Sequence, residues 1–122
     1  MITGAHSIIY ATDAEAARAF FRDVLGLSNV DAGDGWLIFK SPPAELAVHP
    51  TSPDSSGTVE LYLMCDDLKA TVAELKANAV ALSGEIINAG WGLLTTLTVP
   101  GAGDIGLYQP RHPVAYDLPA QS

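Results

Sequence analysis

Hydrophobic and polar positions alternate along two stretches of the chain, and each stretch is followed by a helical pattern. Residues 2–10 and 58–65 alternate with a period of about two, which is typical of half-buried strands. Apolar residues then return at spacings of three and four and form one stripe on each predicted helix: Ala17, Phe20, Phe21 and Val24 on the first, and Leu68, Val72 and Leu75 on the second. The pattern therefore predicts two units that each run from a strand into a helix.

Polar residues mark the ends of the two predicted helices. Thr12 and Glu15 have the spacing of a capping box, in which the threonine oxygen accepts from a free amide and the glutamate reaches back. Either Asp66 or Asp67 is expected to cap the second helix, which should end near Asn78. Both helices are thus expected to start directly after a strand.

Each predicted helix is followed by three short strand-like stretches. They cover residues 27–30, 35–40 and 45–49 in the first half, and 81–87, 92–99 and 104–109 in the second. The simplest interpretation is a repeat of two βαβββ units in a single α+β domain. The units cover about residues 1–50 and 58–113, with a linker of Pro, Ser and Gly at 51–57 and a tail at 114–122.

Aligning the two units brings one polar side chain to the same place in each first strand. His6 falls on Glu60 at an offset of 54 residues (60 − 6). Both side chain types can bind a metal, so this pair is the leading candidate for a site. The alternative is that His6 is a hydrogen-bonded strand residue and that Glu60 faces solvent, since a shift of one residue reverses the face of every side chain.

Composition and charge narrow the range of partners. A chain of 122 residues that is 48% hydrophobic can bury a core of its own. With 14 acidic and 6 basic residues its net charge is −8, which argues against nucleic acid or an anionic membrane surface as a partner. The sequence shows neither a signal peptide nor an apolar stretch long enough to span a membrane, so a cytoplasmic location is expected.

Four short sequence motifs indicate a family resemblance in addition to the periodic pattern. They are Gly4-Ala5-His6-Ser7-Ile8-Ile9-Tyr10, Phe20-Phe21-Arg22-Asp23-Val24-Leu25-Gly26-Leu27, Leu63-Met64-Cys65-Asp66-Asp67-Leu68 and Gly106-Leu107-Tyr108-Gln109-Pro110. Together they resemble the vicinal oxygen chelate superfamily, which contains glyoxalase, the bleomycin-resistance proteins and the extradiol dioxygenases. The resemblance covers residues 2–113 and implies a curved, cup-like mixed sheet with helices on the outside and a divalent metal at its floor. Family members of this length commonly build their sites across two chains, so a homodimer is expected.

The resemblance also implies which residues bind the metal. His6 matches the first-strand histidine of the family and Glu60 matches the fifth-strand ligand. Gly106 stands where the last strand usually has a glutamate, and glycine cannot coordinate a metal. The third ligand stays open, because strand periodicity favours Glu45 and His49, whereas the match of the prolines that follow the two units favours Leu46.

A metal held by His6, His49 and Glu60 would have a 2-His-1-carboxylate set, which suits Fe(II), with Zn, Ni, Mn and Co as alternatives. It would act as a Lewis acid on neighbouring oxygens of a small substrate. Glu60 and Glu45 are the candidates for the general base of a glyoxalase-like isomerisation. The expected function is therefore that of a glyoxalase-like or dioxygenase-like metalloenzyme.

Aromatic side chains in or beside the predicted strands are candidates for substrate binding: Tyr10, Trp36, Tyr62, Trp91 and Tyr108. Tyr62 and Tyr108 are favoured because they share predicted faces with Glu60 and Gly106, and core packing is the alternative role for all five. Gly106 favours a second hypothesis, a metal-free protein that sequesters a small molecule as bleomycin-resistance proteins do. An accessory or regulatory domain is a third.

Overall fold

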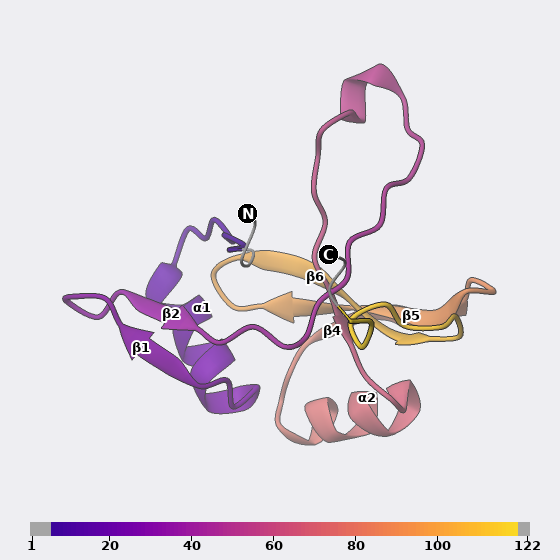
Figure 1. Ribbon diagram of the computed structural model, residues 1–122. Helices are drawn as coiled ribbons and strands as arrows, with labels where there is room; N and C mark the ends of the chain where they lie inside the picture. Colours follow the sequence, from indigo (N-terminus) through magenta and orange to yellow (C-terminus); the bar gives the residue numbers. More distant parts are fainter. Residues whose placement is uncertain (1–5, 120–122) are drawn as a thin grey trace.

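The computed structural model describes residues 6–119 of the chain (Figure 1). These residues form two sheets, several short helical segments and the loops that connect them. One sheet has two strands, in the order β1-β2, and the other has four, in the order β3-β6-β5-β4. In chain order the elements are α1 (Ala14–Ala19), the π-helical turn η1 (Phe20–Val24), β1 (Asn29–Asp31), β2 (Leu37–Phe39), the 3-10 turn η2 (Pro53–Ser55), β3 (Tyr62–Met64), α2 (Leu68–Ala77), β4 (Leu82–Asn88), β5 (Gly92–Val99) and β6 (Gly103–Pro110).

The second half of the chain forms a strand, a helix and three further strands, as the repeat predicts. β3 pairs in parallel with β6, with Tyr62 beside Gly106, and the other neighbours are antiparallel. β5 and β6 form a long hairpin whose register runs from Gly92 beside Pro110 to Val99 beside Gly103. The predicted α+β class with a mixed sheet is confirmed.

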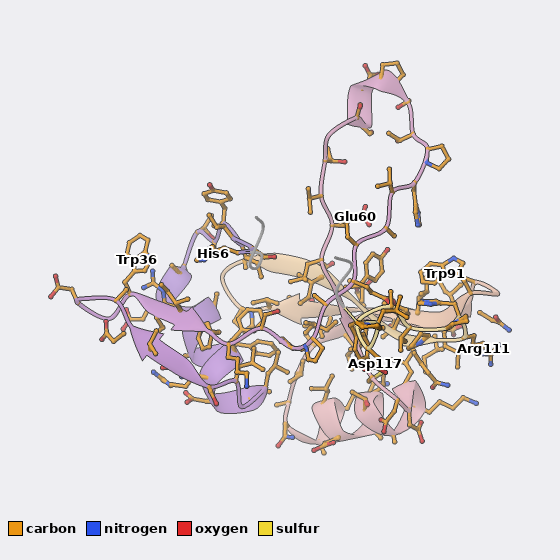
Figure 2. The ribbon with its side chains drawn as sticks, in the orientation of Figure 1. His6, Trp36, Glu60, Trp91, Arg111 and Asp117 are labelled. Carbon is orange, nitrogen blue, oxygen red and sulfur yellow. The ribbon has the colours of Figure 1, made fainter. Side chains whose placement is uncertain are left out.

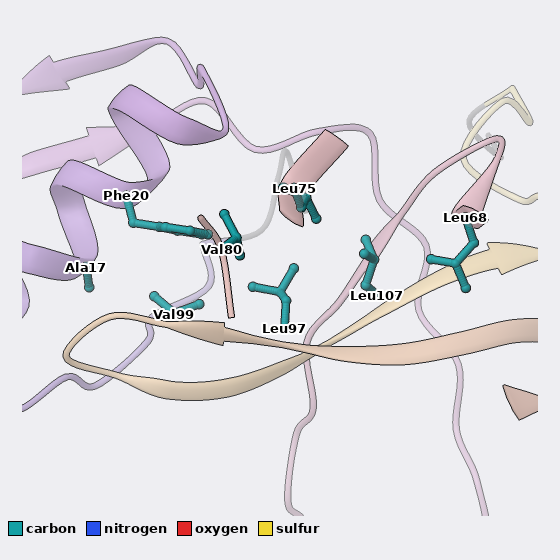
Figure 3. Packing of buried hydrophobic residues seen from close by; sticks show 8 residues of the cluster. All are labelled: Ala17, Phe20, Leu68, Leu75, Val80, Leu97, Val99 and Leu107. Atoms are coloured by element: carbon teal, nitrogen blue, oxygen red, sulfur yellow. The ribbon is translucent and has the colours of Figure 1, made fainter. Parts of the chain in front are cut away.

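The helices cover one face of the four-stranded sheet, and the core lies between them. α2 lies below this sheet in Figure 1. Leu68 at the start of α2 and Leu97 and Val99 on β5 are fully buried. Figure 3 shows these side chains together with Phe20 and Ala17 from the first helical segment. Because alternate residues of β5 point to the helices, burial alternates along this strand and leaves its other face free.

The N-cap of α2 is one of the two residues predicted from the sequence, whereas the N-cap of α1 differs from the prediction. Asp67 caps α2, because its carboxylate accepts a hydrogen bond of 3.1 Å from the Ala70 amide. The capping box predicted for the first helix is wrong: Asp13 accepts from the Ala16 amide at 3.0 Å. The Thr12 hydroxyl donates instead to the Gly101 carbonyl at 3.1 Å, since the turn between β5 and β6 lies beside it.

The first half of the chain has fewer strands among its described residues than the repeat predicts. β1 and β2 form the predicted hairpin, and both Gly33 and Gly35 in its turn have positive φ. The first four residues of the strand predicted over 2–10 lie outside the described part of the chain. Residues 6–10 and 45–49, both predicted to be strands, have no strand structure. A strand requires a neighbour to complete its hydrogen bonds, and within residues 6–119 neither segment has one.

Residues 40–61 form a long segment without strands, interrupted only by the turn η2, and this segment extends away from the rest of the molecule in Figure 1. Large aliphatic side chains along it are almost fully exposed: Leu46 92%, Val48 91% and Val59 92%. The sheets formed by residues 6–119 do not close into a cup. None of the helices in the described part of the chain is long and apolar enough to cross a membrane.

Candidate functional site

An open groove of about 930 Å³ lies on the face of the four-stranded sheet that the helices leave free. Residues 6–10 form one wall and residues 59–62 another. The strands contribute the remaining lining residues: Ser83, Gly84, Glu85, Ile87, Leu94, Thr95, Thr96, Asp104, Ile105 and Gly106. The groove is a natural candidate for a binding site, because it is concave and is lined by both apolar and polar side chains.

Small residues in the middle of the sheet create the hollow. Tyr62, Gly106 and Thr96 lie side by side on β3, β6 and β5, so they form one row across the sheet. Thr96 and Gly106 carry little volume above the sheet. These small residues leave space above the sheet, and the Tyr62 ring occupies the part of that space that lies over Gly106.

The Tyr62 ring lies directly over Gly106. A Cβ atom added to Gly106 would come within 2.2 Å of Cδ1, 2.4 Å of Cε1 and 2.8 Å of Cγ of Tyr62. Non-bonded carbon atoms are stable at about 3.5–4.0 Å, so no side chain fits at position 106 while the ring stays in place. The position that should carry a metal-binding carboxylate by family resemblance is thus covered by an aromatic ring.

Two more aromatic rings, those of Trp91 and Tyr108, pack against Tyr62. The ring centroids of Tyr62 and Tyr108 are 5.7 Å apart, those of Tyr62 and Trp91 are 6.5 Å apart, and those of Trp91 and Tyr108 are 5.4 Å apart. All three pairs have edge-to-face geometry, which is the favourable arrangement for such rings. We call Tyr62, Trp91 and Tyr108 the aromatic cluster, and Tyr62 is its member that lines the groove.

The acidic side chains Glu60, Glu85 and Asp104 and the imidazole of His6 line the groove, and no Lys or Arg is among the described lining residues. Burial, followed by the negative charge of nearby Glu60, raises the pKa of Tyr62 above its ordinary value. The Thr98 hydroxyl donates a hydrogen bond of 2.8 Å to Asp104. The groove therefore combines apolar walls with a surplus of negative charge.

The predicted metal ligands are brought together only in part. His6 and Glu60 both line the groove and lie toward the same side of the sheet in Figure 2. His49 lies on the exposed segment 40–61 and does not line the groove. Between residues 6 and 119 no group of three or more His, Cys, Asp or Glu side chains is close enough to hold a metal ion. Since the Tyr62 ring also covers position 106, residues 6–119 of a single chain do not supply the full ligand set that the family resemblance implies.

Glu45, a candidate general base, contacts the far side of the aromatic cluster instead of the groove. Its Oε1 accepts a hydrogen bond of 3.0 Å from the Tyr108 hydroxyl and its Oε2 accepts one of 2.8 Å from the Ala115 amide. The bond from Ala115 is the main reason that the pKa of Glu45 is below its ordinary value. Burial, with Glu45 next, raises the pKa of Tyr108 to about 12.

The other predicted substrate-binding aromatics lie in different surroundings. Tyr10 lines the groove, whereas Trp91 belongs to the aromatic cluster and does not line the groove. Trp36 lies at the turn of the β1–β2 hairpin, well away from Trp91 in Figure 2, and the Arg18 guanidinium is 4.9 Å from its ring centroid. Trp36 thus forms a cation–π pair outside the groove.

Sequence reasoning missed the polar residues that β4, β5 and β6 contribute to the groove. Thr96 and Asp104 share the face of Gly106, so strand alternation could have found them. Glu85 follows Gly84, whose φ is +80°, in a stretch where the register of β4 against β5 shifts. No sequence signal indicates such a bulge reliably, because any Gly in a strand can mark one.

A family model and several solved structures match this chain. The family model described as "Glyoxalase/Bleomycin resistance protein/Dioxygenase superfamily" matches residues 4–104. No curated protein matches the sequence significantly. Solved structures similar to the chain include TnmS3, an antibiotic binding protein from Streptomyces sp. CB03234, with 27% identity, a TM-score of 0.64, and coverage of 90% of this chain and 98% of that one.

Two further structures extend the comparison. A glyoxalase/bleomycin resistance protein, also from Streptomyces sp. CB03234, has 28% identity and a TM-score of 0.56, and the match covers 83% of this chain and 95% of that one. A lactoylglutathione lyase from Agrobacterium tumefaciens has 18% identity and a TM-score of 0.63, with coverage of 88% and 92%. At that lower identity the lyase bears on the fold alone.

Proposed function

The chain belongs to the glyoxalase/bleomycin resistance protein/dioxygenase superfamily, and from this premise we propose that it is a cytoplasmic protein that binds and sequesters a small planar aromatic molecule. The molecule occupies the groove above the four-stranded sheet. The protein needs no metal for this role, and it leaves the bound molecule chemically unchanged.

The observation that carries the proposal is the Tyr62 ring on Gly106. The ring lies against Gly106 and packs edge-to-face with Trp91 and Tyr108, and it is still 38% exposed beside the groove. A rigid, partly exposed ring offers a stacking surface to a planar ligand at little entropic cost. The aliphatic wall residues Ile8 and Ile9 supply apolar contact area on the opposite side.

The similarity to TnmS3 supports the same proposal. That protein is an antibiotic binding protein, and it matches nearly the whole of both chains at 27% identity. Binding of a small molecule is therefore the described role of a protein with a similar fold. It also requires only the aromatic and aliphatic surfaces that the groove offers, because no reacting group has to be positioned.

Replacing Tyr62 with alanine should weaken ligand binding about two- to twelvefold, because one edge-to-face or stacked aromatic contact contributes about 0.5–1.5 kcal/mol. The measurement is a fluorescence titration with Nile red, an uncharged planar dye, followed by isothermal titration with planar aromatic antibiotics. Trp36→Ala is the matched control, since Trp36 is an exposed aromatic residue outside the groove. Equal affinity of the wild type and Tyr62→Ala would contradict the proposal.

A second candidate is the metalloenzyme of glyoxalase-like or extradiol dioxygenase-like type, which the shared position of His6 and Glu60 on the groove favours. Such an enzyme needs ligands beyond these two. Elemental analysis after reloading with Fe(II), Ni(II) or Zn(II) separates the candidates. About one metal per chain in the wild type and much less in His6→Ala would support the enzyme and argue against a metal-free binder.

We also propose that the protein is a homodimer. Leu46, Val48 and Val59 are more than 90% exposed. Burying each of these side chains in an interface would contribute about 1.5–3 kcal/mol to the free energy of association. A second copy of the chain offers open sheet edges and the same exposed aliphatic segment. Light scattering should give twice the 12.8 kDa chain mass for the wild type, and a monomer for Leu46→Asp combined with Val48→Asp. A monomeric wild type at micromolar concentration would contradict the dimer.

A further inference from the structure

A second concave space, which we call the apolar cavity, lies between α2 and the four-stranded sheet and has a volume of about 180 Å³. Figure 3 shows side chains from both sides of this space, Leu75 on α2 and Leu97 and Leu107 on the sheet. The segment that follows η1 adds a third wall with Leu25 and Leu27. The apolar cavity therefore lies where the first half of the chain meets the second.

The sheet separates the apolar cavity from the groove. Leu107 lines the cavity, whereas Gly106, the residue before it on β6, lines the groove. The same holds on β5 for Leu97 and Thr96. Successive residues of a strand point to opposite faces of the sheet, and no described residue lines both spaces. A ligand in the cavity would thus be bound independently of a ligand in the groove.

The side chains that line the apolar cavity favour an uncharged, apolar occupant. None of the described lining residues carries a charge, and only Thr71 and Cys65 have polar atoms in their side chains. The Thr71 hydroxyl donates to the Asp67 carbonyl at 2.8 Å, and Sγ of Cys65 lies 3.6 Å from the Tyr108 carbonyl. A charged ligand would lose its hydration on entry and would find no charged side chain in return.

The size of the apolar cavity suits a single small ring. An engineered cavity of about 150 Å³ with aliphatic and aromatic walls binds benzene. Side chains that face an open space lack contact partners on that side, and an apolar occupant supplies these contacts. Leu75, Leu97 and Leu107 are at most 7% exposed, so a molecule that reaches them is itself withdrawn from water.

We propose that the apolar cavity is a second binding site, and that it takes a small uncharged hydrocarbon or aryl compound about the size of benzene. This site goes beyond the proposed function, because the groove and its Tyr62 ring have no part in it. The walls consist of side chains from both halves of the chain, so the occupant also contacts both halves.

Cys65 provides a direct reading of occupancy. It is the only cysteine of the chain, it is partly buried, and it lines the apolar cavity. Burial raises the pKa of its thiol, so its modification by methyl methanethiosulfonate, a small uncharged reagent, is slow enough to follow. A dissociation constant of about 1 mM is ordinary for a ligand with as few atoms as benzene. Benzene at about 5 mM should then slow the modification about sixfold, because only the ligand-free fraction reacts. An unchanged rate would overturn the inference.

Two variants that fill the apolar cavity test its location. Thr71→Phe adds a ring from α2, and Leu27→Phe adds one from the opposite wall in case the first variant does not fold. In either variant, once urea unfolding has shown that it is folded, benzene should no longer slow the modification of Cys65. Ala73→Phe is the matched control, since it adds the same ring at an exposed position of α2 outside the cavity, and it should retain the sixfold effect. Equal protection by benzene in the wild type and in both folded filling variants would place the ligand elsewhere and overturn the inference.

A titration with both ligands separates this site from the groove. Benzene should protect Cys65 to the same extent with and without saturating Nile red, because the sheet lies between the two spaces. Protection that Nile red abolishes would mean a single shared site and would overturn the inference. Protection by benzene in a protein that binds no Nile red would support the apolar cavity and contradict the proposed function.

Discussion

Gly106→Ala should destabilise the protein by about 2–3 kcal/mol, although it adds a single methyl group. Gly106 is not among the described residues with positive φ, so alanine has no backbone penalty at this position. The cost comes from the Tyr62 ring, three atoms of which lie within 2.8 Å of the new Cβ. Overpacking of this kind costs about 1–3 kcal/mol, and the displaced ring also loses its edge-to-face contacts with Tyr108 and Trp91.

A double-mutant cycle with Tyr62→Ala tests this cause directly. Urea unfolding of the four proteins gives the free energy of unfolding for each, and Gly106→Ala should cost less than about 0.5 kcal/mol once the ring is absent. The same substitution should also weaken Nile red binding in the presence of Tyr62, because the groove loses its floor. Equal costs in both backgrounds would show that the ring does not restrict position 106.

Leu97→Ala should lower the free energy of unfolding by about 3 kcal/mol, within the range of 2–5 kcal/mol measured for buried leucines. Leu97 lies in the centre of β5, is completely buried, and packs between the sheet and the helices (Figure 3). Removing its side chain leaves a cavity that a hydrogen-bonded strand with neighbours on both sides cannot easily close.

Leu118→Ala removes the same atoms from a side chain that is mostly exposed, and it should change stability by less than about 0.5 kcal/mol. Thermal or urea unfolding of both variants provides the comparison. A loss of less than 1 kcal/mol for Leu97→Ala would mean that the sheet face under the helices is not the core of the protein.

The position of Gly106 connects these stability effects with function. A carboxylate at this place would point from β6 into the groove beside Glu60, as a metal ligand should. With glycine, the neighbouring Tyr62 ring folds across the strand and fills the space with a rigid apolar surface. A single position thus separates a polar floor suited to coordination from an aromatic floor suited to stacking.

The sequence by itself determined the second unit of the fold. Its alternation placed β5 at residues 92–99, its helical stripe placed α2, and the pair Asp66-Asp67 and Asn78 marked the ends of that helix. These features are local, because the period of apolar residues and the caps depend on neighbours only a few positions away. The pairing of His6 with Glu60 came from the internal repeat, and both residues line one groove.

Only the tertiary structure decided the rest. Residues 6–10 and 45–49 have strand-like sequences, yet a strand forms only where a partner completes its hydrogen bonds, and no periodicity reveals whether one is present. The Glu45 carboxylate finds its donors 63 and 70 positions away, and Thr12 finds its acceptor 89 positions away. Tyr62 covers Gly106 because two parallel strands meet in one register. Contacts of this kind depend on packing between distant segments, so sequence could suggest the participants but not their roles.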